Sequence, residues 1–382
     1  MAWVLYHPEG GYYSSHNGLG PQGDFVTSVH LCADFGELLA VQFAQMWQIL
    51  GCPEPFSIVE MGAGQGILAA DVLRSLAQSF PDCCAATCYS IIETSPRLRH
   101  YQCQHFQTLN LAQQPQWLGW DDLPPGIEGC FFSNELVDAL PVHLVEVRCG
   151  KLLEVYVQVR PEASEEAGEI GAQSESKPES EPENRLQEVL APLSTPAIQT
   201  YFDTLGLDLT HYPDGYRTEV NLAAQDWLTT VSQKLQRGYC LTIDYGYSAD
   251  RYYQPSRHQG TLQAYFQHSH HNNPYIHIGQ QDLTAHVNFT ALEQWGGALG
   301  LQKLGFTQQA LMLMALGLGD RLTALATDAT DITAIQTAIA RREVLHQLMN
   351  PLGLGGFGVL AQGKGLTPDE QAQPLKGWSL PI

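Results

Sequence analysis

The stretch IVEMGAGQGIL, residues 58–68, joins an apolar run to an acid, three alternate glycines and a sequence rich in alanine and leucine. The apolar run predicts a buried strand, and the sequence after the glycines predicts a helix. Glycines at such a turn let the backbone approach a bound nucleotide-like ligand, and the helix points its amide-bearing end at the same place. These residues predict a doubly wound α/β sheet with its ligand site at 60–66.

Glu60, the acid before the glycines, distinguishes between the ligands that such a loop could hold. A carboxylate here would repel a pyrophosphate, whereas S-adenosylmethionine (SAM) has no phosphate and carries positive charge at its amino group and its sulfonium. The dinucleotide motif also requires glycine or alanine where Ile67 stands. We therefore predict a SAM loop that binds through Glu60, Gly62, Gly64 and Gly66, with NAD(P) binding or a purely structural turn as alternatives.

A second apolar run, CYSII at 88–92, is followed by an acid, Glu93. In a doubly wound sheet, the acid that ends the second strand contacts the ribose hydroxyls of the ligand. The next residues, Thr94, Ser95 and Pro96, form a helix-start signature, so Glu93 could instead cap the following helix. The two roles are compatible, and we predict that Glu93 binds the sugar.

The third predicted strand runs into the polar sequence SNELVD at 133–138. Polar groups at the carboxyl end of a buried strand face the ligand crevice, which makes Asn134, Glu135 and Asp138 the predicted catalytic residues beside the transferred methyl group. If the acceptor is an arginine guanidinium, the carboxylates would pair with it and hold positive charge as its proton leaves. The structural alternative is that Asp138 caps or braces the turn before Pro141.

The composition limits the classes of partner. A formal net charge of −21 argues against nucleic acid and anionic membrane surfaces, whereas a basic protein or peptide would fit it. No window approaches the ~18–20 apolar residues that span a bilayer, so no direct membrane insertion is expected. The nine irregularly spaced cysteines and the lack of a recognisable signal or transit peptide indicate a cytoplasmic protein with free thiols and no metal site. A homodimer remains open.

The chain divides into three expected parts. Residues 1–140 form a lead-in and the SAM-binding half of the core, 141–237 form an inserted lobe, and 238–382 form the second half of the core with the C-terminal strands. Residues 161–184 within the lobe hold eight glutamates, one lysine and no aromatic residue. Such a segment buries too little apolar surface to fold, so we predict a disordered acidic loop there.

Apolar periodicity and breakers predict the individual elements. The core is expected to contain a helix at 35–50, strands at 56–61, 88–93, 129–133 and 239–246, and helices at 67–79 and 96–109. The lobe is expected to contain an antiparallel ribbon at 144–147 and 152–159 and helix-like runs at 186–205 and 218–236. The last strands are expected within 299–314 and 356–363, with a helix around 320–349 before the final one.

Eight ordered blocks resemble one family, the MidA-type SAM-dependent methyltransferases, which are relatives of the mitochondrial complex I assembly factor that dimethylates an arginine. The similarity covers nearly the whole chain apart from the acidic segment and the last residues. The blocks are LYHP at 5–8 with GYY at 11–13, GDFVTS at 23–28, FGEL at 35–38, EMGAGQG at 60–66, SNELVDALPVH at 133–143, DYG at 244–246, GTLQAY at 260–265 and DLTAHVNF at 282–289.

The resemblance implies a class I SAM-dependent methyltransferase fold, which is a Rossmann-like doubly wound sheet, with SAM as cofactor. It also implies protein arginine N-methylation and, in mitochondrial relatives, a role in building the respiratory NADH dehydrogenase, so the expected partner is a subunit of an NADH-dehydrogenase-type complex. Carried over by position, Gly23, Asp24 and Thr27 would close over SAM. A SAM-binding assembly chaperone without catalysis and a small-molecule methyltransferase are the alternatives.

Overall fold

The computed structural model describes residues 1–15, 28–160, 186–267, 269–327 and 332–379. The predicted closing residues Gly23, Asp24 and Thr27 and the predicted acidic loop at 161–184 lie outside these ranges. None of the described helices combines the length and the apolar character that crossing a bilayer requires.

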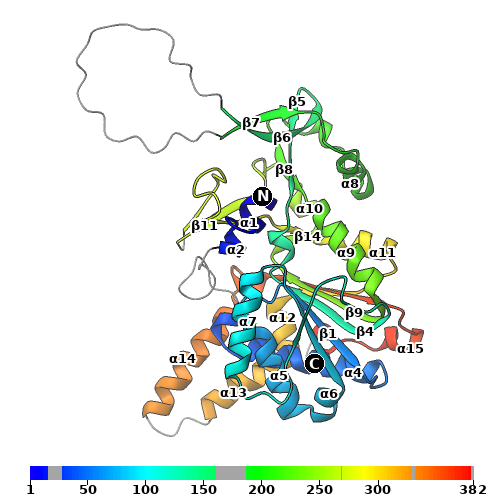
Figure 1. The fold of residues 1–382 in the computed structure, drawn as a ribbon, viewed down its shortest axis with the longest axis vertical. Helices are drawn as coiled ribbons and strands as arrows, with labels where there is room; N and C mark the ends of the chain where they lie inside the picture. The colour runs from blue at the N-terminus through cyan, green and yellow to red at the C-terminus, as the bar shows by residue number, and fades with distance from the viewer. Residues whose placement is uncertain (16–27, 161–185, 268, 328–331, 380–382) are drawn as a thin grey trace, which may run out of the picture.

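The main layer of the described fold is a seven-stranded sheet (Figure 1). Five neighbouring strands run parallel to one another. At one edge of the sheet, the next strand runs antiparallel to these five, and the outermost strand is antiparallel to that one, so it points in the same direction as the five. Each predicted core strand is present, and its ends lie within a few residues of the predicted bounds. In spatial order the strands are β15 (Gln302–Gln308), β16 (Gly358–Lys364), β9 (Leu235–Asp244), β4 (Ile127–Asn134), β1 (Phe56–Met61), β2 (Thr87–Ile92) and β3 (Gln116–Leu118).

Helices cover both faces of this sheet, because its central strands are apolar on both sides. Ile58 of β1 packs into one buried cluster and Val59 into the other. The first face carries α4 (Asp34–Ile49), α5 (Ile67–Ser79), α6 (Pro81–Ala86), α7 (Pro96–Thr108), α12 (Gln309–Leu313), α13 (Gly319–Thr327) and α14 (Ile332–Met349). The second face carries α9 (Leu222–Lys234) and α11 (Phe289–Ala298).

The strand register brings the predicted site residues to one edge of the sheet. Met61 pairs with Ile92 of β2 and with Ser133 of β4, so the three strands end level with one another. Asn134 pairs in turn with Ile243 of β9. The turns after β1, β2, β4 and β9 therefore begin side by side, although they are far apart in the sequence.

A separate antiparallel sheet lies above the main sheet in Figure 1. Its strands are β7 (Leu186–Ala191), β6 (Lys151–Val159), β5 (His143–Arg148) and β8 (Arg217–Val220), and α8 (Ala197–Leu205) connects β7 to β8. The predicted ribbon is confirmed as β5 and β6. The predictions of helix-like runs at 186–205 and 218–236 are partly wrong, because each of these segments begins with a strand, β7 or β8, that pairs with the ribbon. Pairing with partners distant in sequence stabilises the strand conformation there.

The lead-in and a third small sheet pack together. Leu5 of α1 (Ala2–Tyr6) and Tyr12 of α2 (Tyr12–Ser15) are buried against Ala264 and Leu283. The last two residues belong to the antiparallel strands β11 (Gln263–Phe266) and β13 (Asp282–Thr284), and β12 (Ser269–His271) completes that sheet. The remaining α-helices and strands of the described residues are α3 (Ser28–Leu31), α10 (Ala249–Tyr252), α15 (Pro368–Ala372) and the parallel pair β10 (Gly246–Tyr247) and β14 (Val287–Asn288).

Candidate active site

The glycine loop after β1 adopts a conformation that side chains disfavour. Gly62, Gly64 and Gly66 have φ values of +72°, +54° and +79°, and Gly66 begins α5 as its N-cap. A Cβ atom on Gly62 would lie 2.8 Å from a methyl group of Leu136, whereas a Cβ atom on Gly64 would meet nothing within 4 Å. The first glycine allows close packing, and the second leaves open space.

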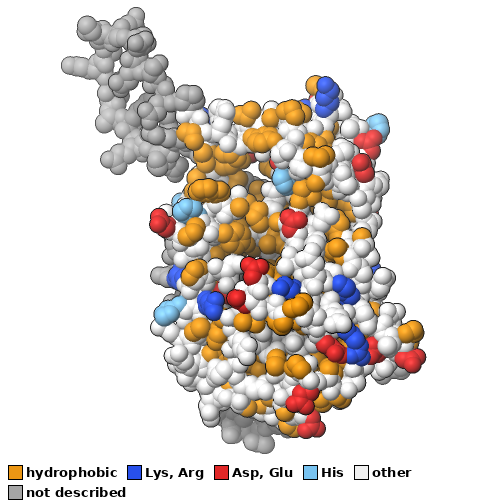
Figure 2. Space-filling model, turned by 45° about the vertical axis from the view of Figure 1, so that its right-hand side comes forward, with side chains coloured by type: hydrophobic (Ala, Val, Ile, Leu, Met, Phe, Trp, Pro, Cys, Tyr) orange, Lys and Arg blue, Asp and Glu red, His pale blue; other side chains and the backbone are white. Residues whose placement is uncertain are grey.

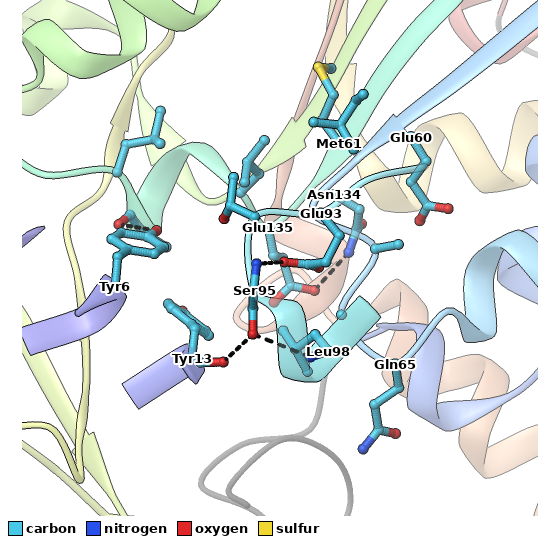
Figure 3. Close-up of a pocket in the computed structure, with 18 of the residues that line it drawn as sticks. Tyr6, Tyr13, Glu60, Met61, Gln65, Glu93, Ser95, Leu98, Asn134 and Glu135 are labelled. Carbon is cyan, nitrogen blue, oxygen red and sulfur yellow. Dashed lines mark hydrogen bonds between the residues drawn. The ribbon is translucent and has the colours of Figure 1, made fainter. Parts of the chain in front are cut away.

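That open space belongs to a cavity of about 480 Å³ at the carboxyl ends of β1, β2 and β4. The volume lies within the ~300–1,000 Å³ typical of small-ligand sites. Gly66 and Asp138 do not line this cavity, because Gly66 starts the helix and Asp138 faces elsewhere. The predicted residues that do line it are Glu60, Gly62, Gly64, Glu93, Asn134 and Glu135, and Figure 3 shows Glu93, Asn134 and Glu135 close together.

Glu93 is held by the start of the next helix without capping it. One carboxylate oxygen accepts the backbone N–H of Ser95 over 2.8 Å, while the Ser95 hydroxyl is the cap of α7 and accepts from the Leu98 N–H. Burial raises the pKa of Glu93. A helix does begin after Thr94-Ser95-Pro96, and Glu93 does line the cavity. The bond from Ser95 fixes the rotamer of Glu93 while the side chain faces the space for a ligand.

Glu60 lies deeper, one residue before the end of β1. It is 3% exposed and accepts a hydrogen bond of 2.8 Å from the Tyr89 hydroxyl on the neighbouring strand. Burial raises the pKa of Glu60 to about 7. Figure 3 shows its carboxylate turned away from Glu93 and Glu135, so Glu60 borders the cavity from a different side.

Gln102 is a site residue that sequence reasoning missed. Its side-chain amide donates to the Gly64 carbonyl over 2.8 Å and to Glu93 over 3.2 Å, and its oxygen accepts from the Trp117 indole over 2.8 Å. Gln102 is fully buried on α7. Nothing in the sequence distinguishes Gln102 from the other polar residues of its helix. Its two hydrogen bonds nevertheless connect the glycine loop to Glu93, the acid predicted to bind the sugar.

Glu135 follows β4 in a strained conformation. Its φ of +52° is unusual for a residue with a side chain, and such strain is typical of functional positions. Its carboxylate accepts from the Asn134 amide over 3.1 Å and from the backbone N–H of Ser28. Burial, followed by the nearby Asp138, raises the pKa of Glu135 to about 8.

Glu135 and Tyr13 also line a second cavity, of about 690 Å³, so they form the wall that the two cavities share. Three acids line the second cavity: Glu135, Asp138 and Asp282. Asp138 and Asp282 are 4% and 1% exposed. Figure 2 shows one face of the molecule, on which hydrophobic side chains gather in a hollow between its upper and lower parts.

Tyr245 orients the Asp138 carboxylate from outside its turn, and the carboxylate also interacts with the backbone N–H of Ala139 within the turn before Pro141. Its Oδ2 accepts from the Tyr245 hydroxyl over 2.5 Å, and its Oδ1 is buried with no partner among the described residues. Asp244 also braces this turn, accepting the backbone N–H groups of Val137 and Asp138 over 2.9 and 3.2 Å. Burial raises the pKa of Asp138 to about 6, and burial together with the neighbouring acids raises that of Asp244.

Aromatic side chains form much of the second cavity, and its basic groups are few. His286 stacks on Tyr247 at 5.0 Å, and burial lowers the pKa of His286 to about 4, so it is neutral at pH 7. The Arg251 guanidinium lies 5.2 Å from the centre of the Tyr247 ring. The aromatic lining residues are Tyr13, Tyr245, Tyr247, Tyr265, His286, Phe306 and Phe357.

The first cavity fits SAM better than a dinucleotide. Glu60, Glu93 and Glu135 line it, and no lysine or arginine does so among the described residues. A pyrophosphate would find no basic side chain among these acids, whereas a sulfonium and an amino group would favour their ionised form and be compensated by it. Asn134 also presents a buried Oδ1 with no partner in the described part of the chain. In that part, no cluster of three or more histidine, cysteine or acidic side chains could hold a metal ion.

Comparisons with known proteins agree with this geometry. A crystal structure of a protein from Burkholderia thailandensis bound to S-adenosyl-homocysteine superposes with a TM-score of 0.78; it is 29% identical and covers 98% of this chain and 89% of its own. The class I SAM-dependent methyltransferase fold, with its additional antiparallel lobe, is thereby confirmed, and so is SAM as the cofactor.

Curated relatives include mitochondrial protein arginine methyltransferases. The NDUFAF7 homolog of Drosophila melanogaster is 30% identical over 338 residues, which are 83% of this chain and 70% of that protein. NDUFAF7 of Mus musculus is 29% identical over 385 residues, which are 93% of this chain and 77% of that protein. A family model described as "Putative S-adenosyl-L-methionine-dependent methyltransferase" matches residues 38–307. The chain therefore belongs to this family of SAM-dependent methyltransferases.

Proposed function

We propose that the protein is a SAM-dependent protein arginine N-methyltransferase whose acceptor is a subunit of a respiratory NADH-dehydrogenase-like complex. The observation that carries the proposal is the position of Glu135, in the wall between the cofactor cavity and an aromatic cavity that also contains Asp138 and Asp282. The names of the curated relatives support arginine as the acceptor. The resemblance of the sequence blocks supports the respiratory subunit.

The acids and rings of the second cavity suit a guanidinium. Carboxylates pair with a guanidinium through two parallel hydrogen bonds, and aromatic faces attract its charge. Asp138 offers the buried Oδ1 that has no described partner, while Tyr245 holds the other oxygen. Because the second cavity contains two further acids, the charge of an arginine would be compensated on several sides.

The reaction divides roles among these residues. SAM, when bound, supplies an electrophilic methyl group, and the bonding electrons stay on its sulfur as the methyl group leaves. Glu60, Gly62, Gly64, Glu93 and Asn134 would hold the cofactor. Glu135 would align the acceptor nitrogen toward the cofactor cavity and stabilise the cation. As that nitrogen bonds the methyl carbon, its proton would pass to Oδ1 of Asp138, which has no partner among the described residues. A free guanidinium does not release a proton readily, because its pKa lies far above neutral.

The test is to incubate the purified protein with radiolabelled SAM and a cell extract containing the respiratory complex, and then to locate the label by mass spectrometry. Label on an arginine of a complex subunit is the expected result. Label on a small molecule would support the small-molecule alternative and contradict the proposal. A client that is captured from the extract but carries no label, with capture unaffected by Gly64→Val, would support the chaperone alternative instead.

A further inference from the structure

The mouth of the second cavity carries an exposed apolar pair. Leu352 is 97% exposed and Phe306 is 42% exposed, and both line that cavity. A single exposed leucine is ordinary on a protein surface. Here two large apolar side chains stand at the opening of a cavity whose floor holds buried acids, so they form an apolar rim, defined here as Leu352 and Phe306.

The loop that carries Leu352 is rigidly organised. The side-chain oxygen of Asn350 accepts a hydrogen bond of 3.1 Å from the Leu352 N–H, and the backbone carbonyl of Asn350 accepts one of 3.0 Å from the Gly353 N–H. A Cβ atom on Gly355 would lie 2.4 Å from the Met349 backbone, so the turn fits only glycine there. The loop therefore presents Leu352 to solvent at a fixed place instead of folding it inward.

The loop that carries Leu352 also ends in a side chain that leads to the acids. Phe357 lies at the end of the same loop, and its ring contacts that of Tyr245 at 5.5 Å. The Tyr245 hydroxyl reaches Asp138 over 2.5 Å. The second cavity thus changes from apolar at its mouth to acidic at its floor, and a bound molecule that fills it needs a cationic end and an apolar neighbour.

We propose that this rim binds an apolar side chain next to the modified arginine, so that the acceptor is an extended basic segment of a protein. The inference rests on the proposed function. Charge complementarity supports a basic segment, because the chain carries a formal charge of −21 and three acids line the second cavity. A free arginine would leave the rim uncovered, whereas a peptide with a leucine close to its arginine would bury the rim and gain the hydrophobic free energy.

The test uses two lysine-ended peptides with a central arginine, identical except that the residues on either side of the arginine are leucine or serine. Binding to the protein saturated with S-adenosylhomocysteine is measured by fluorescence anisotropy, and methylation is measured by mass spectrometry with SAM. The variants are Leu352→Ser and Phe306→Ser. Ile339→Ser is the matched control, since Ile339 is 54% exposed on α14 and does not line the second cavity.

The wild-type protein and Ile339→Ser should bind the leucine peptide about tenfold more tightly, as burial of one leucine predicts. Leu352→Ser and Phe306→Ser should reduce this preference to about twofold while the affinity for S-adenosylhomocysteine stays unchanged. Equal binding of both peptides by the wild type, no binding of either peptide, or a preference that survives both rim substitutions would overturn the inference. If the wild type prefers the leucine peptide and the rim substitutions reduce that preference, but neither peptide is methylated, only the arginine methyltransferase function would be contradicted.

Discussion

The hydroxyl of Tyr245 donates to Oδ2 of Asp138 over 2.5 Å, across 107 positions of sequence. The bond fixes the carboxylate so that its other oxygen, Oδ1, has no partner among the described residues. Hydrogen bonding to a carboxylate favours its charged form and opposes the rise in pKa that burial causes. Tyr245 is therefore a positioning residue that keeps Asp138 both oriented and ionisable.

Replacing Tyr245 with Phe should raise the pKa of Asp138 above its present value of about 6. If the ionised carboxylate binds the acceptor, the acid limb of the kcat/KM profile should shift to higher pH, and KM at pH 7 should increase several-fold. The control is Tyr265→Phe, which removes a hydroxyl bonded to Gln263 in the same cavity. An acid limb that stays in place would contradict this role for Tyr245.

Replacing Glu135 with Gln should leave cofactor binding intact and reduce methylation by at least 100-fold, because the acceptor loses a group that its own positive charge would ionise to a carboxylate at the shared wall. The measurement combines calorimetry with S-adenosylhomocysteine and a radiolabel assay. Undiminished methylation by Glu135→Gln would show that Glu135 does not face the acceptor.

The same substitution predicts a pH dependence of stability. The pKa of Glu135 is about 8 in the folded state, whereas the ordinary value for a glutamate is 4.5, so the folded protein retains a proton that the unfolded chain loses. The contribution of Glu135 to stability is complete below pH 4.5 and is lost as the pH rises toward 8. Glu135→Gln should therefore gain free energy of unfolding relative to the wild type between about pH 5 and 8, on the order of 2 kcal/mol.

Urea unfolding at several pH values measures this difference. Glu370→Gln is the control, because Arg237 and the cap of α15 lower the pKa of Glu370, so its contribution is already present above about pH 5. Its difference from the wild type should stay constant over the same range. Parallel stability curves for Glu135→Gln and the wild type would contradict the raised pKa.

Replacing Gly64 with Val should weaken binding of S-adenosylhomocysteine by at least 100-fold, because the side chain would fill open space in the cofactor cavity. Gly51→Val is a matched control for backbone strain. Gly51 has a φ of +82°, also has nothing within 4 Å of a Cβ position, and does not line that cavity. Calorimetry should show near wild-type affinity for Gly51→Val, and equal losses in both variants would assign the effect to strain alone.

Replacing Gln102 with Leu should weaken S-adenosylhomocysteine about tenfold and lower the free energy of unfolding by about 1–3 kcal/mol, since buried groups lose their partners. Those groups are the Gly64 carbonyl, the Glu93 carboxylate and the Trp117 indole. Gln114→Leu is the control, because Gln114 lies in the same region and donates to the Phe106 carbonyl. Wild-type affinity in Gln102→Leu would exclude the proposed coupling of loop and acid.

Short-range sequence patterns predicted the core strands and the helices that follow two of them. The core strands and the helices after the glycine loop and after Glu93 begin or end within a few residues of their predicted bounds, because apolar runs, glycines and a Ser-Pro start signal act over a few residues. The strands at 186–191 and 217–220 were missed, because they are strands only through pairing with β6 and β5. Glu60, Glu93 and Glu135 were predicted at one edge because parallel strands deliver their ends there.

The sequence by itself determined a SAM-type glycine loop, a parallel sheet and the acids at its strand ends, since each follows from the spacing of neighbouring residues. Only the tertiary structure decided that Glu135 stands between two cavities, that Tyr245 donates to Asp138, and that Tyr13 donates to Asp282 across 269 positions. The reason is physical: backbone periodicity is a short-range property, whereas the direction and partners of a buried side chain are set by whichever distant segments pack against it.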